Sequence, residues 1–93
     1  MFYVYILQCN DNSFYTGHTD DLTKRLAQHA QASFNNCYTA KRLPVSLVYH
    51  GEFDTRERAL IVEKQVKGWS RKKKQALIND DWNEIIRLSK AKQ

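Results

Sequence analysis

The sequence contains only two cysteines among its 93 residues, and they show no pattern of a disulfide framework. Cys9 and Cys37 form no C-x-x-C pair, and together with the three histidines they lack the spacing of a zinc finger or ribbon. The spacing therefore argues against a disulfide-rich or zinc-stabilised domain. We expect both thiols to be reduced, as in cytosolic proteins, because disulfides persist in oxidising compartments.

Long hydrophobic runs are also missing. The amino terminus is apolar only from Phe2 to Leu7, which is too short for a signal peptide or a membrane span, and no basic segment precedes it. We therefore expect a soluble cytoplasmic protein. Repeats, low-complexity segments and internal linkers are absent as well, so we predict one domain over residues 1–88 and a polar tail over 89–93.

Acidic residues are outnumbered by basic ones. Fifteen Lys and Arg residues against ten Asp and Glu residues give a net charge of +5, with a pI near 9.4. Such a balance favours a polyanionic partner. The hydrophobic content of 42% is sufficient for a thin core in a chain of this length.

Seven secondary-structure elements are predicted, in the order β-β-α-β-α-α-α. Strands are predicted at 2–8, 14–17 and 45–53, and helices at 21–31, 55–68, 71–78 and from 82 onward. Turn-forming residues 9–13 join the first two strands into a hairpin, and residues 32–44 form a basic loop that ends in the only proline. Three strands covered by helices predict a small α/β sandwich with one sheet.

Helix starts are indicated by capping residues. Thr19 or Asp20 is predicted to cap the first helix, and Asp54 the second, where Glu57 completes a capping-box pattern. Ser70 and Asp81 are predicted to cap the third and fourth helices.

Two apolar patterns predict core positions. Alternation in the third strand places four side chains on one face, namely Val45, Leu47, Tyr49 and Phe53. In the last helix, Trp82 shares helical spacing with Ile85 and Ile86, which favours a role as a core anchor.

Polar residues interrupt the apolar faces of two predicted helices. Arg25 and His29 share a face with Leu22 and Leu26, and Glu63 lies in the stripe of the second helix. Burying an unpaired charge costs several kcal/mol, so each charge needs a partner or a ligand. One interpretation is that Arg25 and Glu63 pair with each other or extend to the edge of the stripe.

The other interpretation is functional, because these groups and the strand tyrosines are expected to point toward one face of the sheet. Such a set can bind a divalent ion, neutralise a phosphate and move a proton. The ordered series resembles the GIY-YIG nuclease superfamily, in particular its small stand-alone bacterial members, from about Phe2 to Ile78. The residues that carry the resemblance are Tyr5 within Val4–Ile6, the triplet Tyr15-Thr16-Gly17, Arg25, His29 and Glu63.

The resemblance implies a three-stranded antiparallel sheet flanked by helices, and hydrolysis of DNA phosphodiester bonds with one divalent ion, Mg²⁺ or Mn²⁺. By position, Tyr5 and Tyr15 match the motif tyrosines, and Gly17 matches the motif glycine, which allows close backbone approach after the strand. Arg25 and His29 match the helix residues, and Glu63 matches the metal-binding glutamate. The role of His18, which follows the motif glycine, is left open.

The residues permit one mechanism, in which Arg25 grips a nonbridging phosphate oxygen and Glu63 holds the ion. The general base is not decided by the sequence. The favoured assignment is Tyr5 as base or water-positioning group, His29 behind it, and Tyr15 orienting the phosphate or a water.

Two basic segments are expected to contact DNA phosphates with low sequence specificity. The residues concerned are Lys41, Arg42, Arg71, Lys72, Lys73 and Lys74. Taken alone, a lysine run on a helix indicates a solvated face. The favoured function is a metal-dependent DNA endonuclease in repair or processing. The alternatives are a nucleic-acid-binding module of the same fold without useful turnover, and an adaptor acting through Trp69 or Trp82.

Overall fold

Seven elements follow one another in the predicted order in a computed structural model that describes residues 1–30 and 42–90. The strands are β1 (Phe2–Gln8), β2 (Phe14–Thr19) and β3 (Ser46–Phe53). The helices are α1 (Leu22–Ala30), α2 (Arg56–Lys67), α3 (Arg71–Ile78) and α4 (Trp82–Lys90). Ser89 and Lys90 are the last residues of α4, whereas the sequence predicts a polar tail from residue 89 onward. Cys37 and Lys41 lie outside the described residues.

The strands form one antiparallel sheet in the order β2-β1-β3, so β2 and β3 are its two edges. Tyr5, in the central strand, lies opposite Gly17 of β2 and His50 of β3. The β1–β2 register is regular, whereas the β1–β3 register shifts between Ile6 and Leu7. The three-stranded antiparallel sheet flanked by helices confirms the predicted fold.

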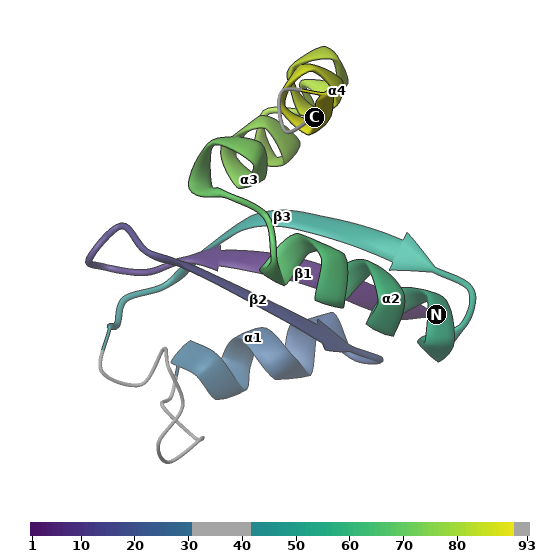
Figure 1. The fold of residues 1–93 in the computed structure, drawn as a ribbon. Coiled ribbons are helices and arrows are strands. Elements are labelled where there is room, and N and C mark those ends of the chain that lie inside the picture. The colour runs from purple at the N-terminus through teal and green to yellow at the C-terminus, as the bar shows by residue number, and fades with distance from the viewer. Residues whose placement is uncertain (31–41, 91–93) are drawn as a thin grey trace.

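Helices cover both faces of the sheet (Figure 1). The alternation of side chains along β1 separates Tyr5 from Ile6. α1 lies on the Tyr5 face, where its His29 contacts Tyr5, whereas α2, α3 and α4 lie on the Ile6 face. Among the described residues, none of the helices combines the length and the apolar character that crossing a membrane requires.

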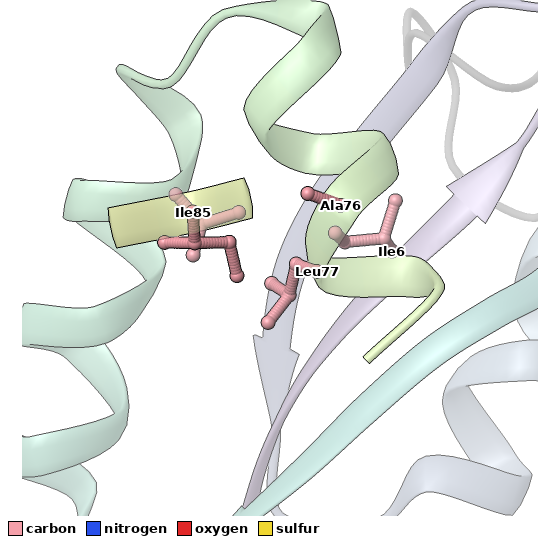
Figure 2. Packing of buried hydrophobic residues seen from close by; sticks show 5 residues of the cluster. Ile6, Ala76, Leu77 and Ile85 are labelled. Atoms are coloured by element: carbon pink, nitrogen blue, oxygen red, sulfur yellow. The ribbon is translucent and has the colours of Figure 1, made fainter. Parts of the chain in front are cut away.

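The main hydrophobic core lies between the sheet and the last three helices (Figure 2). Its five buried members are Ile6, Val66, Ala76, Leu77 and Ile85, each at most 5% exposed. Burying an aliphatic side chain of this size stabilises the fold by about 1.5–3 kcal/mol. This cluster fixes α2 against the face of the sheet opposite α1.

Two of the predicted core positions are wrong. Trp82 is 53% exposed, and its indole Nε1 donates a hydrogen bond to Asp80 Oδ1 at 2.9 Å. Ile85 anchors α4 instead, while Ile86 remains 50% exposed. In β3 the register shift leaves Leu47 38% exposed, and Val48 packs against the core. A bulge reverses the alternation of a strand, which explains the second error.

Two helix caps also differ from the prediction by one position. Asp21, rather than Thr19 or Asp20, accepts a hydrogen bond from Lys24 N at the start of α1. Thr55, rather than Asp54, caps α2 by accepting from Arg58 N. The predicted caps Ser70 and Asp81 are confirmed, since each accepts a hydrogen bond from a backbone N–H three residues later.

Candidate active site

A buried pair of polar side chains connects β1 to α1. The Tyr5 hydroxyl lies 3.0 Å from His29 Nε2, and the two residues are 0% and 1% exposed. His29 enters the apolar face of α1 in place of a hydrocarbon side chain, and the tyrosine hydroxyl satisfies one of its ring nitrogens. The predicted neighbourhood of these two residues is therefore observed, but it is closed to water.

Tyr15 completes a group of three rings. Its ring centroid lies 5.2 Å from that of His29 and 6.4 Å from that of Tyr5, in tilted and edge-on arrangements that aromatic rings favour. Tyr15 is partly exposed, whereas Tyr5 is not. Of the two motif tyrosines, only Tyr15 offers a surface to solvent.

Gly17 provides the space for the Tyr5 ring. A Cβ atom at Gly17 would lie 2.6 Å from the Tyr5 hydroxyl oxygen and 3.1 Å from the Tyr15 ring. Gly17 lies inside β2, which continues to Thr19. The glycine therefore allows the Tyr5 side chain to approach closely within the strand. The expectation that Gly17 allows a close backbone approach after the strand is wrong.

We expect Gly17→Ala to lower the free energy of unfolding by about 1–3 kcal/mol, because the added methyl group overpacks a site closed by a buried phenol. Urea denaturation measures this loss. Gly68→Ala is the matched control, since the nearest atom to a Cβ there is a backbone oxygen at 3.5 Å. Equal stability of the two variants would contradict the close packing.

The environment of His29 lowers the pKa of its imidazole. Burial is the larger cause, and the positive charge of Arg25 is the second. Arg25 lies one helical turn before His29 in α1, where its charge acts on the ring. His29 is held in its neutral form and accepts or donates one hydrogen bond with Tyr5.

This shift predicts a pH dependence of stability. Because the folded state resists protonation of His29, the unfolded chain binds more protons below its ordinary pKa of about 6.5. The free energy of unfolding should therefore fall as the pH is lowered through about 6.5 toward the folded-state pKa. His29→Gln should show a smaller decrease between about pH 7.5 and pH 5.5 in urea titrations. An unchanged pH profile in the variant would contradict the assignment.

Arg25 also lines a small polar pocket at the end of β2. The pocket has a volume of about 170 Å³ and is formed by Phe2, His18, Thr19, Asp20, Arg25 and Arg56. It brings together side chains from β1, β2, α1 and α2. The two guanidinium groups outnumber the single carboxylate of Asp20 in this pocket, so its environment suits an anion.

Glu63 projects from α2 on the other face of the sheet. Its side chain is 12% exposed, and its Oε2 lies 3.0 Å from His18 Nδ1 and 3.5 Å from Lys67 Nζ. These two contacts differ from the Arg25–Glu63 pair that the sequence suggests as one interpretation. His18 thus connects Glu63 to the pocket that Arg25 lines.

The sheet divides the candidate residues into two groups. Tyr5, Tyr15, Gly17 and His29 lie on the α1 face, as the regular β1–β2 register requires. Glu63 lies on the α2 face with His18, and Arg25 reaches the pocket at the end of β2. The prediction that all of them point toward one face of the sheet is therefore wrong, because the candidates lie on both faces of the edge strand β2. No role could be predicted for His18 from the sequence.

The basic residues of α3 do not form a uniform solvated face. The Arg71 guanidinium lies 4.3 Å from the centroid of Phe14, and Lys73 Nζ lies 4.5 Å from that of Trp69. Burial lowers the pKa of Lys74, and Lys72 lines a shallow surface hollow. Such cation–π contacts fix the positions of two charges.

Arg42 is engaged in a structural contact. Its Nε donates to Asp11 Oδ2 at 3.0 Å, and its carbonyl oxygen accepts from Asn10 N at 2.8 Å. These contacts connect the start of the second described segment to the β1–β2 turn. A role of Arg42 in binding DNA stays a prediction, as it does for the α3 residues.

Comparison with known proteins identifies the class to which this arrangement belongs. The model of a family described as the GIY-YIG catalytic domain matches residues 1–76. The chain belongs to the GIY-YIG family. This family consists of nucleases, which supports a nuclease-type function and a nucleic-acid substrate.

The relatives are proteins of similar size. A UPF0213 protein of Haloquadratum walsbyi is 45% identical over 78 residues, which cover 84% of this chain and 86% of the relative. A UPF0213 protein of Staphylococcus saprophyticus is 44% identical, with 84% and 94% covered. The solution NMR structure of a UPF0213 protein from Bacillus halodurans is 42% identical and superposes with a TM-score of 0.55 over 85% of this chain and 84% of that one.

Proposed function

We propose that this protein is a divalent-metal-dependent endonuclease that hydrolyses DNA phosphodiester bonds with low sequence specificity, in DNA repair or processing. The observation that carries the proposal is the polar pocket at the end of β2. Arg25 and Arg56 line it, and His18 connects it to the carboxylate of Glu63. Positive charge for a phosphate thus lies one side chain away from a carboxylate that suits a cation.

The donor set at Glu63 fits a hard divalent ion such as Mg²⁺ or Mn²⁺. Among the described residues, no group of three or more His, Cys, Asp or Glu side chains is arranged to hold a metal. A protein cage is not required, because Mg²⁺ in such enzymes takes one or two carboxylates and completes its shell with water and substrate phosphate. When bound, the ion supplies Lewis-acid stabilisation of the phosphate charge.

The arginines would bind and orient the phosphate. Hydrolysis adds negative charge to the phosphate in the transition state, and fixed guanidinium groups lower the energy of that charge. The planar fork of Arg25 can contact two oxygens at once, which favours one orientation of the phosphodiester. Arg56 lies at the first position of α2, where the positive end of the helix dipole adds to the field.

The two motif tyrosines would have different roles in orienting water and moving protons. Tyr5 is fully buried with its hydroxyl beside His29, so it is poorly placed to contact an attacking water. Tyr15 is partly exposed and contacts the same histidine edge-on, which favours Tyr15 as the group that orients water or phosphate. In this arrangement Tyr5 and His29 would hold Tyr15 in place, whereas Tyr5 could act as base or water-positioning group only through its contact with His29.

The basic helix would bind the flanking DNA. Phe14 and His18 lie on the same face of β2, about 13 Å apart along the strand. Arg71, held over Phe14, is therefore close enough to the pocket to contact a neighbouring phosphate of the same substrate. Contacts of this kind supply affinity without sequence selection.

A second candidate is a nucleic-acid-binding module of the same fold that does not cut. One observation favours it, namely that the ammonium group of Lys67 lies 3.5 Å from Glu63 Oε2 and already balances the charge of the carboxylate. A binding module has no need of a cation there. The two candidates differ in their response to metal, since only the nuclease requires it.

The test is a cleavage assay with single-stranded, duplex and branched DNA in Mg²⁺, in Mn²⁺ and in excess chelator. We expect cleavage of at least one substrate with either ion and none with chelator. Binding is measured in parallel by fluorescence anisotropy as the salt concentration is raised. Salt-sensitive binding of all three DNAs without cleavage in either metal would reject the nuclease and favour the binding module.

A further inference from the structure

The contact between His18 and Glu63 contains an unsatisfied atom. His18 Nδ1 is buried and makes no aligned hydrogen bond within the described residues, although it lies 3.0 Å from Glu63 Oε2. The two atoms are therefore close without the direction that a hydrogen bond requires. Buried polar atoms in proteins nearly always have a hydrogen-bond partner, and an ion that binds at the atom is one explanation for an exception.

The spacing of the two atoms matches that of two neighbouring metal ligands. In an octahedral shell with bonds of about 2.1 Å, adjacent donor atoms lie about 3.0 Å apart. The separation of His18 Nδ1 and Glu63 Oε2 is 3.0 Å. A cation beside both atoms would be bound without a change in their separation.

We propose that His18 is a second protein ligand of the divalent ion, through Nδ1, and that the Glu63 site favours Mn²⁺ over Mg²⁺. The inference rests on the metal site of the proposed function. Neutral imidazole nitrogen is a good ligand for first-row transition ions, whereas Mg²⁺ strongly prefers oxygen. One nitrogen beside one carboxylate therefore shifts the selectivity toward Mn²⁺.

Lys67 balances the negative charge of Glu63 when no ion is bound. Its ammonium group lies 3.5 Å from Glu63 Oε2, and its side chain is 55% exposed. A flexible, solvated lysine can move into water when a cation arrives, at a small cost. Lys67→Ala should consequently raise the affinity for Mn²⁺, because it removes a competing positive charge.

The test measures Mn²⁺ binding to the untagged chain by electron paramagnetic resonance, without DNA. We expect ¹⁴N hyperfine coupling to the ion in the wild type and its loss in His18→Asn, with Mn²⁺ affinity reduced by at least about tenfold. His50→Ala is the matched control, since His50 is exposed in β3 and should keep both properties. Glu63→Gln should remove binding.

The outcomes separate this inference from the proposed function. Absence of ¹⁴N coupling in the wild type, or equal Mn²⁺ affinity of the wild type and His18→Asn, would overturn the role of His18. Cleavage that still requires Glu63 would leave the nuclease standing in that case. Conversely, His18-dependent binding of Mn²⁺ without cleavage of any DNA would support the ligand and reject the nuclease.

Discussion

Glu63→Gln is expected to abolish metal-dependent cleavage, with a loss of about a thousandfold or more. The substitution keeps the size of the side chain and removes the negative charge that would hold the cation. Affinity for DNA should change little, because the groups expected to contact phosphates are arginines and lysines. Single-turnover cleavage and anisotropy on the same DNA measure the two quantities separately.

The control for Glu63 is Glu57→Gln, which removes an exposed carboxylate from the first turn of the same helix. This variant changes the net charge equally and should cleave like the wild type. A Glu63→Gln protein that retains full cleavage would remove the carboxylate from the mechanism. A parallel loss in both variants would indicate that net charge, rather than the site, controls the rate.

Arg25→Ala is expected to reduce the cleavage rate about 10²–10³-fold, with a much smaller loss of DNA affinity. The reason is that the guanidinium would stabilise charge that develops only in the transition state, whereas ground-state binding is shared among many cations. The rate constant under saturating DNA and the dissociation constant provide the comparison. Arg25→Lys should recover little of the rate, because an ammonium group lacks the planar fork.

Arg58→Ala serves as the matched control for Arg25. The side chain of Arg58 is 73% exposed on α2 and forms a long ion pair of 3.8 Å with Asp54. Its removal should leave the rate within about twofold, as expected for an exposed pair. Equal losses of rate and affinity in Arg25→Ala would instead assign Arg25 a structural role beside His29.

Local sequence patterns predicted the elements of the fold, because each pattern depends on neighbouring residues alone. Three examples are the apolar run of β1, the hairpin turn and the serine before α3. Each of them determines the structure of residues that are close to it in the sequence. The errors at Leu47 and Trp82 have a different origin. They depend on a register shift against β1 and on how α4 lies over α3, which are long-range contacts that periodicity does not contain.

The candidate site was predictable in its composition and not in its arrangement. Period-two alternation already implies that His18 and Gly17 point to opposite faces of β2. Which helix covers each face depends on the complete fold, so the separation of Tyr5 from Glu63 was not visible in the sequence. Burial of the Tyr5 hydroxyl likewise follows from the packing of α1 and decides which tyrosine can reach water.

The candidate residues lie on both faces of β2. The length of the β1–β2 turn therefore decides which of them faces α1 and which faces α2, although the turn is far from the pocket. The turn is held by Cys9 N donating to Ser13 O and by Asn12 at a positive φ of 67°. If the turn changed length by one residue, β2 would slide along β1 and exchange its two faces. His18 would then face α1, and Tyr15 and Gly17 would face α2. An insertion at the far end of the hairpin would thereby dismantle the pocket without altering any residue within it.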